Sequence, residues 1–143
     1  MPLLDQFLPT TVIGSYPQPR WLIDHERLRK AGVPRVRADD IWAVDEAHLA
    51  EAIEAAPLVA LADQQAAGVD VITDGEMGRE SYFNHFANSL GGVDENEVGR
   101  GVNRVGSVSL LPLVNGPIER PRPVELDAAE FLVEHATAKT KVT

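Results

Sequence analysis

Blocks of apolar residues alternate along this chain with blocks of polar, helix-forming residues, and this pattern predicts strands joined by helices. Thr10–Ser15 is β-branched and ends in a glycine and a serine, which is typical of a strand. Val69–Thr73 is a second such run, and its consecutive Val71 and Ile72 suit a strand covered on both faces. Thr140–Thr143 has the character of a third strand that has barely begun where the sequence stops.

Helical spacing of apolar residues fills most of the intervening segments. The predicted helices cover Trp21–Ala31, Asp45–Ala55, Ser81–Leu90 and Glu125–Ala136. Pro57 either kinks the second helix or begins a further one, on whose face Leu61 and Gln65 lie and which Gly68 closes. Helices between strands predict parallel strands joined by crossovers, and hence an α/β fold.

Two segments are predicted to be loops. Val33–Trp42 is basic and then acidic, as in a surface loop. Gly91–Pro123 is punctuated by glycines and prolines and is predicted to be irregular, with a hairpin inside Val105–Val114.

Composition narrows the class of protein. The chain has 143 residues, 13 Lys and Arg, 22 Asp and Glu, a formal net charge of -9 and no cysteine. An acidic balance argues against binding to nucleic acid or an anionic membrane surface. The absence of cysteine excludes disulfides, thiolate nucleophiles and a thiolate zinc site built from this sequence alone. There is no apolar run of about 20 residues and the start lacks the layout of a secretion signal, so a cytoplasmic location is the default expectation.

The first predicted strand ends in Ile13, Gly14 and Ser15. Glycine lets the backbone approach a ligand closely, the following N–H groups can point at an anion, and the serine hydroxyl adds a donor. This arrangement suits a substrate carboxylate. The alternative interpretation is a tight turn out of the strand with no ligand.

The second predicted strand ends in Asp74, Gly75 and Glu76. Carboxylates at the carboxyl end of a parallel strand face the rim where α/β proteins bind ligands, and there they can pair with an ammonium group, bind a metal or act as a base. The alternative is a carboxylate that stabilises the start of a following helix. No two of the four histidines have the spacing of metal ligands on a helix.

These motifs carry a resemblance to a known family. Leu8–Pro19 resembles the opening of the catalytic barrel of cobalamin-independent methionine synthase and its short single-barrel relatives, as does Gln64–Glu76. Pro112–Ile118, followed by Arg122–Val124, resembles the next segment of the family. The resemblance implies a (β/α)8 TIM-type barrel, which needs about 250 residues. Residues 1–143 would then form a single N-terminal portion of it, with the first two βα units and the start of the third strand.

The resemblance also implies a function. Members of the family transfer a methyl group to the sulfur of homocysteine, which a zinc ion holds as thiolate. By resemblance, Ile13, Gly14 and Ser15 hold the amino-acid end of this thiol substrate and Glu76 pairs with its ammonium group. The zinc ligands of the family, cysteines and a histidine on later strands, have no counterpart here, so no catalytic or metal-binding residue is assigned. The methyl donor, a folate or a corrinoid, stays open.

Three strands of eight cannot close a barrel and would leave open edges. We therefore expect a truncated product, a fragment, or a piece completed by another chain, without activity by itself. Two alternatives remain: a non-catalytic truncated α/β fragment that self-associates, and a zinc-dependent thiol transferase of the same superfamily with another methyl donor or electrophile.

Overall fold

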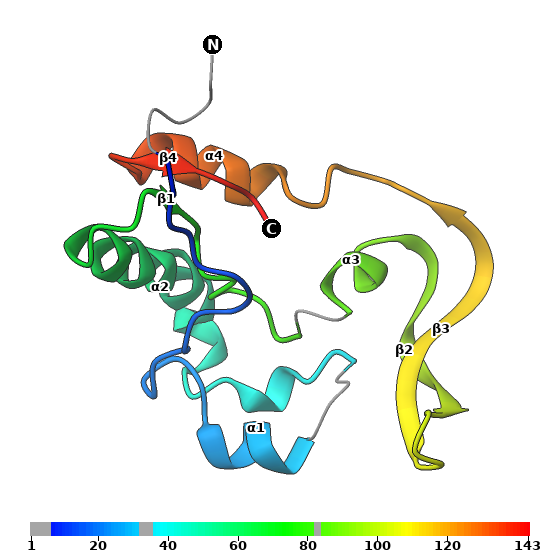
Figure 1. The fold of residues 1–143 in the computed structure, drawn as a ribbon. Coiled ribbons are helices and arrows are strands. Elements are labelled where there is room, and N and C mark those ends of the chain that lie inside the picture. The colour runs from blue at the N-terminus through cyan, green and yellow to red at the C-terminus, as the bar shows by residue number, and fades with distance from the viewer. Residues whose placement is uncertain (1–6, 32–35, 82–83) are drawn as a thin grey trace. The chain divides into compact units, whose positions relative to one another are not determined.

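The computed structural model describes residues 7–31, 36–81 and 84–143, and their contacts divide the chain into two units (Figure 1). The strand-and-helix unit comprises Met1–Pro19, Glu46–Gly78 and Glu125–Thr143. The hairpin unit comprises Arg20–Asp45 and Arg79–Val124. In the described part of the chain, no helix has the length and apolar character that a membrane span requires.

Three parallel segments form the sheet of the strand-and-helix unit. β1 (Val71–Ile72) pairs with β4 (Lys139–Thr140), and Thr11 forms a parallel bridge to Val71 on β1. The predicted parallel direction of these segments is therefore confirmed. The segments are shorter than predicted, and the first is a single bridge, because the chain turns at Gly14 with a φ of +81°.

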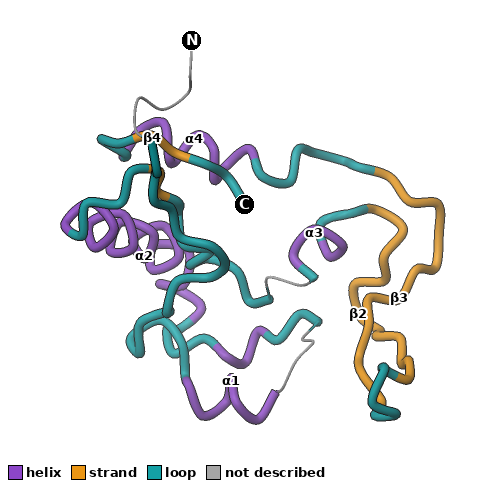
Figure 2. The backbone as a smooth tube through the Cα atoms, in the orientation of Figure 1, coloured by secondary structure: helices purple, strands orange, loops and turns teal. Residues whose placement is uncertain are grey.

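Two helices complete this unit, α2 (Glu46–Ala66) and α4 (Leu126–His135) (Figure 2). Leu61 of α2, Ile72 of β1 and Leu132 of α4 form a cluster in which each side chain is at most 2% exposed. Phe131, the neighbour of Leu132 on α4, packs against this cluster. The three apolar side chains tie both helices to the central strand through burial of apolar surface.

α2 runs through Pro57 without interruption, so the alternative of a new helix beginning there is wrong. Its end was predicted correctly. Gly68, with a φ of +72°, donates its N–H to the carbonyl of Gln65 at 3.0 Å, and Val69 donates to the carbonyl of Gln64 at 3.0 Å. This pair of bonds is the Schellman motif, which places glycine in the left-handed conformation just after a helix.

In the hairpin unit, α1 (His25–Ala31) begins four residues later than predicted. Its start is fixed by Asp24, whose Oδ1 accepts the N–H groups of Glu26 at 2.9 Å and Arg27 at 3.1 Å, as an N-cap does. Gly32 and the first residues of the predicted Val33–Trp42 loop lie outside the described residues. The described part of that loop contains the short 3-10 helix η1 (Asp39–Ile41).

The helix predicted over Ser81–Leu90 is reduced to α3 (His85–Asn88), and Tyr82 and Phe83 lie outside the described residues. The Ser89 hydroxyl donates to the carbonyl of His85 at 2.9 Å, at the end of this helix. The chain enters a strand at Gly91, which leaves no room for another helical turn.

The prediction of an irregular Gly91–Pro123 was wrong, and the hairpin in this segment is much longer than the one predicted inside Val105–Val114. β2 (Gly91–Val102) and β3 (Val108–Glu119) form an antiparallel hairpin whose turn lies between Val102 and Val108. Glycine usually weakens a strand, because it has no side chain to pack. In β2, however, the Leu111 side chain fills the space beside Gly101. A Cβ atom at position 101 would lie only 2.8 Å from Cδ1 of Leu111. Asn103 makes the turn, because its Oδ1 accepts the N–H groups of Val105 and Ser107.

Asp94 organises an irregular stretch in β2, where the register with β3 shifts between Val93 and Val98. Its Oδ1 accepts the N–H groups of Asn96 and Glu97, both at 2.8 Å, and its Oδ2 accepts the side-chain amide of Asn115. The hydrogen bond from the Asn96 N–H, followed by that from Glu97, holds the pKa of the Asp94 carboxyl below its usual 3.8.

We expect acid to loosen this stretch. A carboxyl with a lowered pKa stabilises the folded form at pH values above its unfolded pKa, and this contribution is lost as the pH falls through the folded value. The Asn96 and Glu97 amides should therefore exchange faster with solvent below about pH 3.8, as NMR would detect. In Asp94→Asn the exchange of these amides should no longer depend on titration at this position. If the exchange of these amides depended on pH in the same way in both proteins, the Asp94 carboxylate would not be the group that stabilises this stretch.

Candidate functional site

Ser15 and Glu76 follow two neighbouring parallel segments, and their side chains meet. The segments are in register through the bridge between Thr11 and Val71. Beyond it, the Ser15 hydroxyl donates to Oε2 of Glu76 at 2.7 Å. The structure thus brings together the two residues that the sequence assigned to opposite ends of one ligand, while ligand binding itself stays a prediction.

Further hydrogen bonds hold the two segments side by side. The N–H and hydroxyl of Thr10 both donate to Oδ2 of Asp70 at 2.8 Å. The Tyr16 N–H donates to the carbonyl of Gly75 at 2.9 Å. Bonds therefore flank the Ser15–Glu76 contact along the chain and fix the relative position of the two loops.

The turn that carries Glu76 has an unusual backbone. Gly75 has a φ of +71°, and Glu76 follows with a φ of +55°, which is uncommon for a residue with a side chain. A Cβ at position 75 would lie 2.7 Å from the Cβ of Tyr16 and 3.0 Å from that of Ala60, so glycine is required for space as well as conformation. A left-handed non-glycine residue held in place by surrounding hydrogen bonds is the kind of local strain that accompanies functional sites.

Gln64 supports this turn from α2, and the sequence reasoning missed it. Its side chain is 1% exposed; its Nε2 donates to the carbonyls of Ala60 and Thr73, both at 2.9 Å, and its Oε1 accepts the Thr73 N–H at 3.1 Å. Of the predicted face, Leu61 is buried but Gln65 is only partly so. The buried residues of α2 are Ala56, Pro57, Ala60, Leu61 and Gln64. Helical spacing of Gln64 from Ala60 and Leu61 is the signal that would have found it.

Two carboxylates in this turn are nearly buried. Asp74 is 7% exposed and Glu76 is 8% exposed. Among the described residues, Asp74 accepts only the Glu76 N–H, at 3.2 Å, and Glu76 accepts only the Ser15 hydroxyl; neither forms an ion pair there. Burying an unpaired charge is unfavourable, so the pair favours a cationic group from a ligand.

Ile13 and Gly14 present backbone rather than side chain to this site. The Ile13 side chain is 88% exposed, and a Cβ on Gly14 would meet no atom within 4 Å. The N–H groups of Gly14 and Ser15 donate to no other residue in the part of the chain that the structure describes. They are therefore available to an anion, in keeping with the predicted carboxylate site.

Metal ligands are not assembled here. Within the residues described, no three side chains of His, Asp or Glu gather in a way that could hold a metal ion. The arrangement therefore consists of amide donors and a hydroxyl on one segment and two carboxylates on the next. It matches a ligand that carries one negative and one positive group close together.

Comparisons with known proteins show which family the chain resembles. A family model described as the catalytic domain of cobalamin-independent synthase matches residues 8–141. A methionine synthase of Sulfurisphaera tokodaii is 46% identical over 136 residues, which cover 94% of this chain and 36% of the relative. One of Sulfolobus acidocaldarius is 40% identical over 126 residues, covering 87% and 33%.

A solved structure is also similar. It is a B12-independent methionine synthase from Shewanella sp. W3-18-1 in complex with selenomethionine, with a TM-score of 0.74 and 30% sequence identity. The match covers 93% of the present chain and 36% of the other. The chain thus spans about a third of the length of these relatives.

Proposed function

The chain belongs to the cobalamin-independent synthase catalytic-domain family, and on that premise we propose that it carries the amino-acid half of a methionine synthase active site. The observation that carries this proposal is the 2.7 Å contact between Ser15 and Glu76 at two neighbouring strand ends. Homocysteine and methionine carry a carboxylate and an ammonium group on one carbon atom. One loop offers N–H groups to the carboxylate, and the adjacent loop offers a carboxylate to the ammonium group, so the two loops together suit such a ligand.

Each residue has a separate task in the proposed complex. The N–H groups of Gly14 and Ser15 donate to the ligand carboxylate. Ile13 precedes them and positions the backbone of this loop. The Glu76 carboxylate receives the ammonium group, with Asp74 adding negative potential beside it. The Ser15 hydroxyl, which donates to Glu76 in this structure, can turn to the ligand carboxylate once the ammonium group satisfies Glu76. The selenomethionine in the related solved structure supports a ligand of this class.

In the same proposal, the three parallel segments are the first three strands of a (β/α)8 barrel. The zinc ion that the family implies does not fit the residues of this chain. It has no cysteine, and its described residues gather no set of metal ligands. The proposal therefore places the zinc ligands and the site for the methyl donor, folate or corrinoid, on other strands. The task of Ile13, Gly14, Ser15 and Glu76 is to bind and orient the amino acid.

Titration calorimetry with L-methionine tests the function. We expect Ser15→Ala to lower the affinity about tenfold or more, because a hydrogen bond to a charged group contributes about 1.5–3 kcal/mol. Ser107→Ala removes a hydroxyl group of the same kind from a different serine, in the exposed turn between β2 and β3, and should leave the affinity for methionine unchanged. Equal affinities for Ser15→Ala and the original chain would refute the proposed role of this loop.

A second candidate function, a non-catalytic module that self-associates, is favoured by apolar residues exposed on the hairpin. Val102 is 75% exposed and Val108, its partner across the hairpin, is 65% exposed. Light scattering after size exclusion separates the two candidates, because a monomer that binds methionine agrees only with the first.

A further inference from the structure

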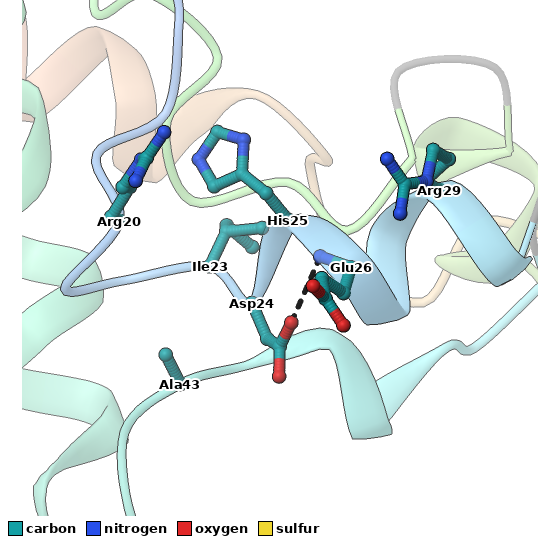
Figure 3. Close-up of a pocket in the computed structure, with 7 residues that line it drawn as sticks. All are labelled: Arg20, Ile23, Asp24, His25, Glu26, Arg29 and Ala43. Carbon is teal, nitrogen blue, oxygen red and sulfur yellow. Dashed lines mark hydrogen bonds between the residues drawn. The ribbon is translucent and has the colours of Figure 1, made fainter.

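We propose that a cavity in the hairpin unit binds a small dicarboxylate, with one carboxylate on Arg20 and the other on Arg29. The cavity has a volume of about 490 Å³, and its lining residues in the described part of the chain lie between positions 20 and 43 (Figure 3). This volume lies in the range of small-molecule sites, about 300–1,000 Å³. The proposal concerns a site separate from Ser15 and Glu76 and does not depend on the function proposed above.

Two guanidinium groups at this cavity have no carboxylate partner. Arg20 and Arg29 form no hydrogen bond or ion pair with any residue that the structure describes. In Figure 3 their side chains and that of His25 extend to one side of the backbone, and the carboxylates of Asp24 and Glu26 extend to the other. In a chain with a net charge of -9, two unpaired arginines at one cavity are a specific feature of the fold.

The nearest carboxylate is already engaged. Asp24 accepts the N–H groups of Glu26 and Arg27, and its Oδ2 lies 3.2 Å from Nε of Arg27. The hydrogen bond from the Arg27 N–H is the main cause that lowers the pKa of Asp24. Because Asp24 occupies N–H groups at the start of α1, the proposed ligand is held by side chains and not by the end of this short helix. Of the two described carboxylates that line the cavity, Asp24 is thus engaged with α1, and Glu26 is the other negative charge near the two arginines.

The lining also defines the ligand. A guanidinium group binds a carboxylate through two parallel hydrogen bonds. Two separate arginines can therefore each bind one carboxylate in this way, and a ligand with two carboxylates satisfies both better than a single small anion does. Arg20 and Arg29 lie on either side of His25 in Figure 3. The fully buried Ile23, together with Ala43, adds apolar surface to the lining. A short methylene chain with a carboxylate at each end, such as glutarate, matches these three features.

Calorimetry with glutarate, at low ionic strength and on the whole 143-residue chain, tests the proposal. Arg20→Gln and Arg29→Gln should each lower the affinity about tenfold, and butyrate, with one carboxylate, should bind about tenfold more weakly than glutarate. Arg104→Gln, an exposed arginine of the hairpin turn, changes the net charge equally and should leave glutarate binding as it was. Circular dichroism checks that each variant is folded.

Several results would overturn the proposal. Absence of glutarate binding at millimolar concentration would do so, as would equal binding by the two cavity variants and the original chain. An equal loss in Arg104→Gln would show that only the overall charge matters. Inorganic phosphate or butyrate binding as tightly as glutarate would contradict the dicarboxylate class. Methionine binding should stay intact in both cavity variants, which separates this test from that of the function proposed above.

Discussion

Replacement of Glu76 by glutamine is expected to lower the affinity for L-methionine about a hundredfold without lowering the free energy of unfolding. Truncating one partner of a buried, hydrogen-bonded charge pair costs about 2–5 kcal/mol of binding free energy, and about 1.4 kcal/mol corresponds to a factor of ten. Glu76 is 8% exposed, so solvent screens the proposed pair only weakly. The loss should therefore exceed that of Ser15→Ala.

Stability should respond differently from binding. Glutamine keeps the shape of the side chain, and its Oε1 can still accept the Ser15 hydroxyl. The substitution also removes one of two carboxylates that are buried within two residues of each other and form no ion pair with another described residue. Relief of that unfavourable burial should keep the melting temperature at or above its original value.

Two controls sharpen this experiment. Glu130→Gln, on the exposed surface of α4, changes the net charge equally and should not affect binding. A methionine analogue without the amino group, 4-(methylsulfanyl)butanoate, should bind Glu76→Gln and the original chain with the same affinity, because it has no ammonium group to lose. If Glu76→Gln weakened both ligands equally, the carboxylate would not be the ammonium partner.

Gln64→Leu should lower the free energy of unfolding by about 3 kcal/mol. Leucine fills a similar volume but forms none of the three side-chain hydrogen bonds, and it leaves the N–H and carbonyl of Thr73 without their partner. Each buried polar group that loses its partner costs about 1–3 kcal/mol. Since Thr73 is only 2% exposed, water cannot easily replace the glutamine.

Urea denaturation followed by circular dichroism measures this effect, with Gln65→Leu as the matched control. Gln65 is the next residue of α2, and its single described hydrogen bond, to the Thr137 hydroxyl, is exposed, so its replacement should change stability by less than about 1 kcal/mol. Similar losses in the two variants would show that Gln64 is an ordinary helix residue. A loss confined to Gln64→Leu should also weaken methionine binding, because Thr73 leads directly into the Glu76 turn.

The features that the sequence predicted correctly are those set by local patterns. β-branched runs located the three parallel segments, and glycine at position 68 located the end of α2, because both signals act within a few residues. The pairing of Ser15 with Glu76 followed from a general rule, since the carboxyl ends of neighbouring parallel strands lie at one edge of a sheet.

The features that were missed depend on distant partners. Gly101 counts against a strand until the side chain of Leu111 on β3 is placed beside it, and Asn103 resembles many other polar residues until the N–H groups of Val105 and Ser107 are seen to donate to its side chain. Most glutamines are exposed, so the helical spacing of Gln64 from Ala60 and Leu61 is a weak sign that its side chain is buried. Its hydrogen bonds to Thr73 become visible only when the end of β1 lies against α2.

The strand-and-helix unit is assembled from three stretches of sequence that are separated by the two stretches of the hairpin unit, and this has a consequence for the order of folding. Thr10 bonds Asp70 sixty residues away, and Ser15 bonds Glu76 sixty-one residues away. The β2–β3 turn, in contrast, joins residues within five positions, as does the end of α2. Contacts across long stretches must first overcome the entropy of closing a large loop. The hairpin and α2 should therefore form early, and the contact between Ser15 and Glu76, where we propose that the amino acid binds, should be among the last parts of the molecule to take shape.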